Sequence, residues 1–267
     1  MIFRGSVYSQ MLEMKTAVSV LFPNNFRKAW PEPAEHPYRV VYLLHGLVGN
    51  NANWTDYTML PYFAQDTHTV FIMPDATRSY YCDQKYGQKY FSYVCHELPD
   101  IAKRLFNISA KREETAVIGC SMGGYGALKA GLSRPDFFGT IGAIAPALLY
   151  FDEFLTMLKN ADETGGEIGG FYTPQMRRDF EAILGPELAW DPNCEIMELV
   201  KKAETQKITP RIFCTCGSED PLVGFNLRFR DEMKTSKLDF TYEEAEGRHD
   251  WDFFNTGLKK SVEFFLA

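Results

Sequence analysis

The chain has 267 residues, of which 45% are apolar and 15% aromatic, enough to bury a sizeable core in one large α/β domain or two small ones. Its formal net charge of −7 at pH 7 argues against nucleic acid or an anionic membrane surface as the main partner. No stretch approaches the roughly 18 apolar residues of a membrane span, and no apolar run near the N-terminus suits a signal peptide. We therefore expect a soluble, cytoplasmic protein.

The first part of the chain predicts strands followed by a short helix and another strand. Residues 3–10 and 14–22 alternate apolar and polar side chains, like the two strands of an antiparallel hairpin. The apolar, β-branched runs 39–46 and 69–75 are typical of strands buried in a parallel sheet. Between these two runs, residues 56–65 favour a short helix.

The middle of the chain continues the alternation of helices and strands. Residues 91–106 have the apolar spacing of a helix, and Pro99 either kinks this helix or marks its true start. The apolar run 116–121 predicts a strand and 122–133 a helix, and 138–146 predicts another strand.

Residues 147–205 break this alternation, because they are charged and helix-like, with an interruption at "TGGEIGG". We interpret them as a cap or lid inserted between two strands. A strand at 211–220, a helix at 222–236, an edge strand at 239–247 and an amphipathic helix at 250–266 follow. The alternation as a whole predicts a mostly parallel, doubly wound sheet in a single α/β domain over residues 1–267.

The cysteines form no C-x-x-C pair, and we expect them to be reduced thiols. Cys214 and Cys216 alternate within a predicted strand, so their side chains should point to opposite faces of the sheet. The six positions are Cys82, Cys95, Cys120, Cys194, Cys214 and Cys216.

The segment "GCSMGGYGA" at residues 119–127 contains a G-x-S-x-G pattern centred on Ser121. Its place between a buried strand and a helix is that of a nucleophile elbow, where a serine occupies a strained turn and glycines leave room for it. The alternative is an ordinary glycine-rich turn that binds phosphate, but Tyr125 stands where a phosphate loop requires lysine. Cys120 is a poor candidate nucleophile, because Ile118 and Met122 fill the positions that would then need small residues.

A serine hydroxyl needs a base, and His249 is the single histidine of five that follows Ser121 in the chain. A carboxylate must orient that histidine. Asp220 is favoured because a proline after it fixes a short side chain at the end of a strand. Glu219 is the second choice, and Asp250 is more suited to capping the last helix.

An oxyanion would need two N–H donors. We expect one from the backbone of Met122, next to the nucleophile, and the other from Leu47 in the loop after the strand ending at Gly46. His45 is expected to hold this loop rather than to act as a base.

The segments "YLLHGLVGNNANW", "GCSMGGYGALKAGL", "GSEDPL" and "GRHDWDFF" resemble the esterase D-like branch of the α/β-hydrolases. This group contains tributyrin esterases, acetylxylan and feruloyl esterases of carbohydrate esterase family one, and S-formylglutathione hydrolases. The likeness runs from about residue 5 to 265 and is weakest in 147–205. It implies an α/β-hydrolase fold and no metal or other cofactor. It assigns the nucleophile, acid and base to Ser121, Asp220 and His249, and the oxyanion hole to Leu47 and Met122.

The leading hypothesis is a serine carboxylesterase that acts on a small-molecule or oligosaccharide ester with a short acyl group, such as acetyl, butyryl or hydroxycinnamoyl. An S-formylglutathione hydrolase or other thioesterase is the alternative, although that group usually has histidines where this chain has Cys120 and Tyr125. A non-catalytic binding protein of the same fold is a third hypothesis. A homo-oligomer formed through the cap or an edge strand is compatible with the sequence. Candidate pocket residues are Trp54, Tyr80, Tyr81, Phe151, Phe154 and Phe171.

Overall fold

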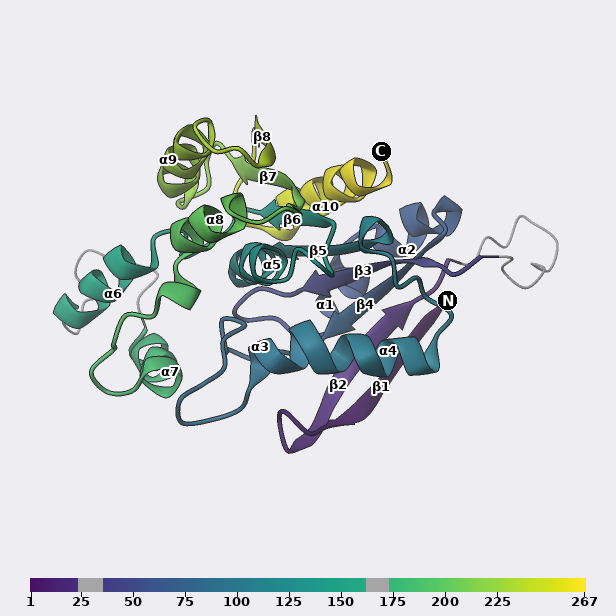
Figure 1. Ribbon diagram of the computed structural model, residues 1–267, viewed down its shortest axis with the longest axis horizontal. Coiled ribbons are helices and arrows are strands. Elements are labelled where there is room, and N and C mark those ends of the chain that lie inside the picture. The colour runs from purple at the N-terminus through teal and green to yellow at the C-terminus, as the bar shows by residue number, and fades with distance from the viewer. Residues whose placement is uncertain (24–35, 162–172) are drawn as a thin grey trace.

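The centre of the structure is an eight-stranded sheet with the strand order β1-β2-β4-β3-β5-β6-β7-β8 (Figure 1). The computed structural model describes residues 1–23, 36–161 and 173–267. Strands β3 to β8 are parallel, whereas β1 and β2 form an antiparallel hairpin that joins the sheet along β4. The fold is the predicted α/β-hydrolase fold. The strands are β1 (Ile2–Ser9), β2 (Met14–Leu21), β3 (Arg39–Leu44), β4 (Thr69–Pro74), β5 (Thr115–Cys120), β6 (Thr140–Ile144), β7 (Arg211–Gly217) and β8 (Asp239–Ala245).

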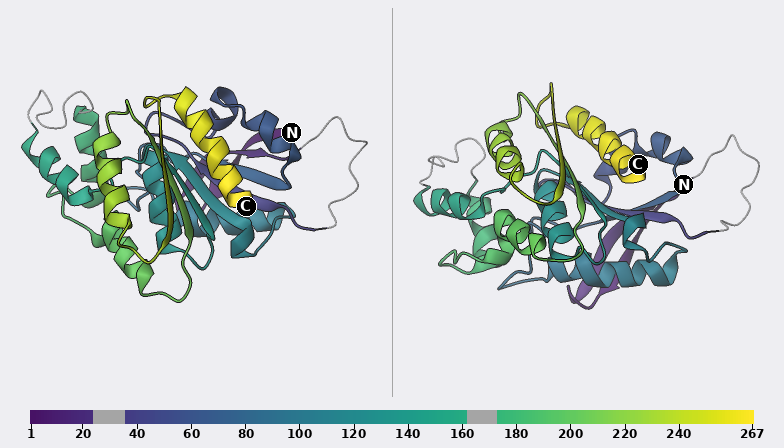
Figure 2. Two further views of the ribbon diagram at one scale, coloured as in Figure 1. Left: turned by 90° about the horizontal axis from the view of Figure 1, so that it is seen from above. Right: turned by 45° about the horizontal axis from the view of Figure 1, so that its top comes forward.

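Helices cover both faces of this sheet, and Figure 2 shows α4 and α10 on opposite sides of it. The apolar side chains of β3 alternate accordingly. Tyr42 packs with the layer of α4 and α5, and Val41 with that of α1, α2 and α10. Cys214 and Cys216 divide between the same two layers, which confirms their predicted opposite directions. The helices are α1 (Asn53–Tyr57), α2 (Leu60–Phe63), α3 (Tyr90–Ser92), α4 (Leu98–Leu105), α5 (Met122–Ser133), α6 (Phe151–Asn160), α7 (Pro174–Leu184), α8 (Ile196–Glu204), α9 (Val223–Met233) and α10 (Trp251–Leu266).

Two of the predicted helices differ in detail from the structure. The helix expected at 56–65 is divided into α1 and α2, because Thr58 has an extended backbone and ends the first of them. The helix expected at 91–106 consists of α3, a π-helical turn over Tyr93–Glu97 and α4. Pro99 is the second residue of α4, directly after the π-helical turn, so it lies where the helix changes its hydrogen-bonding pattern and not at the beginning of the whole helical run.

The described residues between β6 and β7 form α6, α7 and α8, and α6 and α7 lie together at one end of the molecule (Figure 1). Helix α7 is joined to the loop after β4. The guanidinium of Arg78 lies 2.8 Å from the carboxylate of Asp179, which is only 7% exposed. The backbone N–H groups of Lys85 and Tyr86 donate to carbonyls of α7. Polar contacts, one of them to the buried carboxylate of Asp179, therefore fix α7 to the body.

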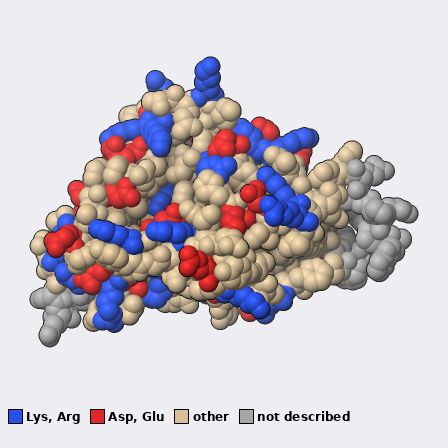
Figure 3. All heavy atoms as spheres, turned by 60° about the horizontal axis from the view of Figure 1, so that its bottom comes forward, with Lys and Arg blue, Asp and Glu red and all other residues tan. Residues whose placement is uncertain are grey.

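Acidic and basic side chains are interspersed on the face of the molecule shown in Figure 3. Within residues 1–23, 36–161 and 173–267, no helix combines the length and the apolar character that crossing a membrane would require.

Candidate active site

Ser121 lies at the junction of β5 and α5 with φ 55° and ψ −120°, a strained conformation for a residue other than glycine. Two backbone hydrogen bonds join it to the end of β6 and to the loop after that strand. Its N–H donates to the carbonyl of Ile144 at 2.9 Å, and its own carbonyl accepts from Ala147 at 3.1 Å. The turn therefore has the geometry that the sequence motif predicts, with its serine fixed against the end of β6.

The glycines on either side of Ser121 leave no room for a side chain. A Cβ atom on Gly119 would lie 2.2 Å from the carbonyl oxygen of Gly123, and one on Gly123 would lie 2.2 Å from the carbonyl oxygen of Leu44. Both contacts are with backbone atoms, which cannot move aside without displacing the strand or the helix. Close packing of β3, β5 and α5 explains the small residues of the motif.

Cys120 is completely buried on the other face of the sheet, among the side chains that pack against α10. Burial raises the pKa of its thiol above the ordinary value. A buried neutral thiol is a poor nucleophile, in agreement with the sequence argument against this residue.

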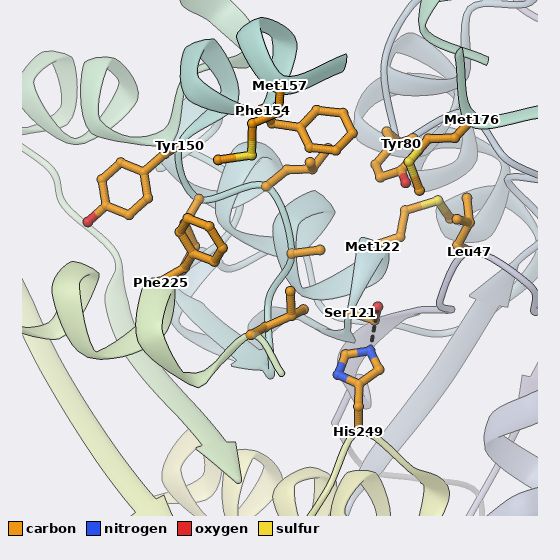
Figure 4. A pocket seen from close by; sticks show the side chains of 14 residues that line it. Leu47, Tyr80, Ser121, Met122, Tyr150, Phe154, Met157, Met176, Phe225 and His249 are labelled. Carbon is orange, nitrogen blue, oxygen red and sulfur yellow. Dashed lines mark hydrogen bonds between the residues drawn. The ribbon is translucent and has the colours of Figure 1, made fainter. Parts of the chain in front are cut away.

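His249 connects Ser121 to Asp220, the carboxylate favoured by the sequence. Its Nε2 lies 2.9 Å from the Ser121 Oγ (Figure 4), and its Nδ1 lies 2.7 Å from the Asp220 Oδ2. The carboxylate of Asp220 is buried, and its other oxygen accepts a 2.8 Å hydrogen bond from the N–H of Leu222. Since the carboxylate accepts from Nδ1–H, the lone pair of Nε2 faces the serine hydroxyl and can receive its proton.

The loops that carry Asp220 and His249 are hydrogen-bonded to each other. The N–H of Ser218 donates to the carbonyl of Ala245, and the N–H of Glu219 donates to that of Gly247, both at 2.9 Å. The parallel pairing of β7 with β8 thus continues past the ends of the strands. It brings the two loops side by side, although α9 and β8 separate them along the chain.

The alternative carboxylates have other partners. Glu219 pairs with Arg248 at 2.9 Å, and both side chains are largely exposed. Asp250 caps α10, where its Oδ1 accepts from the N–H of Phe253 at 3.1 Å. Neither carboxylate is hydrogen-bonded to the ring of His249, so Asp220 is the one that orients it.

The two predicted oxyanion donors, Leu47 and Met122, both line the cavity next to Ser121. Met122 is the first residue of α5, so its N–H has no partner within the helix and lies at the positive end of the helix dipole. A Cβ on Gly46 would lie 3.6 Å from the Cβ of Ser121, which places the backbone preceding Leu47 against the serine. This arrangement can present two N–H groups to an oxyanion.

His45 is completely buried and holds this loop, as predicted. Its Nδ1–H donates to the carbonyl of Gly46 at 2.7 Å, and its Nε2 accepts from the N–H of Ala76 at 2.9 Å. The hydroxyl of Tyr81 donates to the carbonyl of His45 at 3.0 Å. Both ring nitrogens are thereby occupied, so the ring is not available as a base.

A cavity of about 200 Å³ opens onto Ser121 and His249, and its other walls are mainly apolar (Figure 4). Two of the predicted pocket residues, Tyr80 and Phe154, line it. The remaining lining residues are Leu47, Met122, Ala147, Leu148, Leu149, Tyr150, Met157, Met176, Leu222 and Phe225.

The structure places three other pocket candidates in the core, away from this cavity. Trp54 packs edge-on against Trp251 at 5.4 Å between ring centroids. Tyr81 lies over Gly126 and reaches His45, and Phe151 stacks on Tyr125. These three side chains are at most 1% exposed. Phe171 lies outside the described residues.

Sequence reasoning missed the methionines and Phe225 as wall residues. The pocket residues that the sequence predicted are all aromatic, whereas Met157 and Met176 are walls that come from α6 and α7. Phe225 lies on α9, five residues after Asp220. Phe225 could have been predicted to lie near the site, because its helix directly follows the loop that carries Asp220.

No group of three or more His, Cys, Asp or Glu side chains that could hold a metal ion occurs in the part of the chain that the structure describes.

Comparison with known families matches residues 9–265 to the esterase family. The chain belongs to this esterase family. It is thus a hydrolase, built on the α/β-hydrolase fold.

This esterase is 29% identical over 267 residues to an acetyl esterase of Caldicellulosiruptor saccharolyticus, covering 98% of this chain and 97% of that protein. Its fold is similar to that of S-formylglutathione hydrolase FrmB from Staphylococcus aureus, with a TM-score of 0.80, 24% identity and coverage of 100% and 99% of the two chains. A ferulic acid esterase gives a TM-score of 0.79 at 21% identity, covering 99% of this chain and 96% of that one.

Proposed function

We propose that this esterase is a serine carboxylesterase that hydrolyses short acyl esters through an acyl-enzyme. The observation that carries the proposal is the continuous hydrogen-bonded chain from Asp220 through His249 to Ser121, which ends at the apolar cavity. No other part of the site needs to move for the serine hydroxyl to lose its proton to His249 Nε2.

The reaction follows from this geometry in two halves. The Ser121 Oγ attacks the ester carbonyl while its proton passes to His249, and the N–H groups of Leu47 and Met122 stabilise the oxyanion. His249 then donates the proton to the departing alkoxide, which leaves an acyl group on Ser121. A water molecule deprotonated by His249 hydrolyses this acyl-enzyme and restores the serine. Asp220 stabilises the imidazolium form of His249 in both halves.

The cavity supports an apolar acyl group of limited size. Its walls include Phe154, Met157 and Met176 from α6 and α7, so we assign the segment 147–205 the role of a cap that selects the acyl group. Acetyl and butyryl groups are compatible with a cavity of about 200 Å³. The similarity to an acetyl esterase supports acetyl esters first, and the similarity of fold to a ferulic acid esterase adds hydroxycinnamoyl esters to the candidates.

An S-formylglutathione hydrolase is the second candidate, favoured by the similarity of fold to FrmB. The elbow of this chain carries Cys120 and Tyr125 instead of the histidines usual in that group. A comparison of kcat/KM for S-formylglutathione with that for p-nitrophenyl acetate separates the two functions. We expect the oxygen ester to be the better substrate.

The test of the proposal is Ser121→Ala, assayed with p-nitrophenyl acetate and with a fluorophosphonate probe. We expect the activity to fall by at least about 10³-fold and the probe label to disappear. The matched control is Ser6→Ala, since Ser6 is an exposed serine on β1. Activity of Ser121→Ala within a few-fold of the wild type would reject the assignment, and wild-type protein that is never labelled would favour a non-catalytic binding protein.

A further inference from the structure

Cys82, Lys129 and Cys194 meet in the interior of the protein, away from Ser121. Cys82 lies in the loop after β4, Lys129 on α5, and Cys194 in a short turn before α8. The Nζ of Lys129 lies 2.9 Å from the Sγ of Cys82 and 3.5 Å from that of Cys194, and the two sulfurs are 3.7 Å apart. All three residues are at most 5% exposed. Segments 112 positions apart in the chain thus bring two thiols and a cation together.

Lys129 has no carboxylate partner among the ion pairs of the described residues. Its described hydrogen bonds are those to the two sulfurs, and its ammonium lies 5.2 Å from the ring centroid of Phe91. An ammonium buried this deeply is costly unless it faces a negative charge. A thiolate on one of the two cysteines supplies that charge.

The sulfur of Cys82, which is nearer to the ammonium, is the better placed of the two to carry a negative charge. The hydrogen bond from Cys194 and the charge of Lys129 lower the pKa of Cys82, against the opposing effect of burial, and the hydroxyl of Tyr125 lies 4.0 Å away. The hydrogen bond to Cys82 and burial raise the pKa of Cys194. Cys95, which is equally buried, has its pKa raised to about 12 by burial.

A second cavity, of about 400 Å³, reaches this cluster. Cys82, Lys129 and Cys194 line it, and it shares no lining residue with the cavity at Ser121. Asp83 and Arg134 are also among its walls, so it is polar enough to admit water and a small polar oxidant. A low-pKa thiolate next to a cation and a second thiol is the arrangement of a redox-active pair.

We propose that Cys82 and Cys194 form an oxidation site at which a hydroperoxide converts the two thiols to a disulfide. The Cys82 thiolate attacks one oxygen of hydrogen peroxide. An S–O bond forms, the O–O bond breaks, and hydroxide leaves and takes a proton from solvent. Cys194 then attacks the sulfur of the Cys82 sulfenic acid. The S–S bond forms, the S–O bond breaks, and the hydroxyl leaves as water with the proton of Cys194. Two thiols are oxidised and one peroxide is reduced to two waters.

The disulfide would tie the segment 147–205 covalently to the loop after β4. The sulfurs must approach by less than about 2 Å to reach bonding distance. Tyr80, two residues before Cys82, lines the cavity at Ser121, so the bond joins a wall of that cavity to the inserted segment. Oxidation also removes the negative charge that faces Lys129.

The experiment treats the full-length protein with hydrogen peroxide at neutral pH, blocks remaining thiols, digests it without reductant and maps the peptides by mass spectrometry. We expect a linked pair of peptides containing Cys82 and Cys194, an intact mass lower by two hydrogens, and reversal by dithiothreitol. A disulfide at other cysteines, a bond between Lys129 and Cys82, or no linked product would each overturn the proposal.

Three variants assign the roles. Cys194→Ser should stop the reaction at a Cys82 sulfenic acid that dimedone traps. Lys129→Met should slow the oxidation of Cys82 roughly ten-fold, because less of the thiol is ionised. Cys95→Ser is the matched control and should give the linked peptides at the wild-type rate. An unchanged rate in Lys129→Met would reject the role of the cation, and if that variant does not fold, Cys194→Ser alone decides whether Cys82 is the reactive thiol.

Discussion

The imidazole of His249 lies 2.9 Å from the hydroxyl of Ser121, although 128 positions separate the two residues in the chain. The contact depends on two turns at the same edge of the sheet. One follows β5 and the other follows β8, where backbone hydrogen bonds tie it to the loop of Asp220. Ligands bind at this edge in open α/β sheets.

Asp220→Asn should reduce kcat by about 10³–10⁴-fold while the protein stays folded. The amide NH₂ would donate to Nδ1, so the proton of His249 would move to Nε2 and the lone pair facing Ser121 would be lost. Steady-state kinetics with p-nitrophenyl acetate measure the loss, and thermal unfolding checks the fold. Glu219→Gln is the control, and it should retain most of the activity because its carboxylate pairs with exposed Arg248.

Gly123→Ala should lower the free energy of unfolding by about 1–3 kcal/mol, because the Cβ of the alanine would overlap the carbonyl of Leu44. Gly224→Ala in α9 is the matched comparison. A Cβ there has no neighbour within 4 Å, so alanine should raise the free energy of unfolding by about 0.5–1 kcal/mol. Urea unfolding of both variants provides the measurement. Equal stability of the two would contradict the packing argument.

Asp179→Ala should loosen α7 from the loop after β4. It removes the partner of Arg78 and a hydrogen bond from Gln175, and it leaves a partly buried guanidinium unpaired. We expect faster proteolysis within α7 and a larger effect on KM than on kcat, because Met176 on that helix lines the cavity. Glu198→Ala removes an exposed pair with Lys201 and should change neither quantity.

Met157→Ala should enlarge the cavity and shift acyl preference toward longer chains. We expect the ratio of kcat/KM for octanoyl over acetyl p-nitrophenyl esters to rise about ten-fold, the size of effect that a few methylenes produce in an apolar pocket. Met59→Ala is the control, since Met59 is 56% exposed and does not line the cavity. An unchanged ratio in Met157→Ala would place the acyl group elsewhere.

The reaction of Cys82 with iodoacetamide should persist at a lower pH than the reaction of an ordinary thiol. Its pKa is lowered by Cys194 and Lys129, so the thiolate disappears only when the pH falls below that lowered value. Lys129→Met should move the midpoint of the profile to higher pH. Alkylation rates of the Cys82 peptide across the pH range measure the midpoint for the wild type and for Lys129→Met. Identical pH profiles for the two proteins would contradict the conclusion that Lys129 lowers the pKa of Cys82.

The position of Ser121 on a tight turn and the order of Ser121, Asp220 and His249 could be predicted from the sequence. Both follow from local signals, since glycine spacing marks the elbow and the alternation of strands with helices places the later loops at one edge of the sheet. The choice of Asp220 over Glu219 also depended on a local feature, the proline that follows it. These local signals are reliable because glycine and proline affect the backbone conformation directly, whatever packs around them.

The cavity walls could not be predicted in the same way. Phe151 and Phe154 are on the same helix, yet only Phe154 lines the cavity, because the packing of α6 against Tyr125 turns the other ring into the core. Trp54 likewise follows the loop of Leu47 but packs on Trp251 of the last helix. Whether such a ring points into the cavity or into the core depends on contacts between segments far apart in the chain, and the periodicity of the sequence does not predict those contacts.

None of Ser121, Asp220 and His249 belongs to the segment 147–205, which nevertheless provides several walls of the cavity. The three proposed reacting groups follow β5, β7 and β8, whereas the walls Phe154, Met157 and Met176 come from α6 and α7. If the proposed roles hold, the groups that react and part of the surface that selects the acyl group belong to separate stretches of the chain. Exchanging the segment 147–205 between related esterases could therefore change the substrate preference of the recipient protein while its serine, histidine and aspartate stay unchanged.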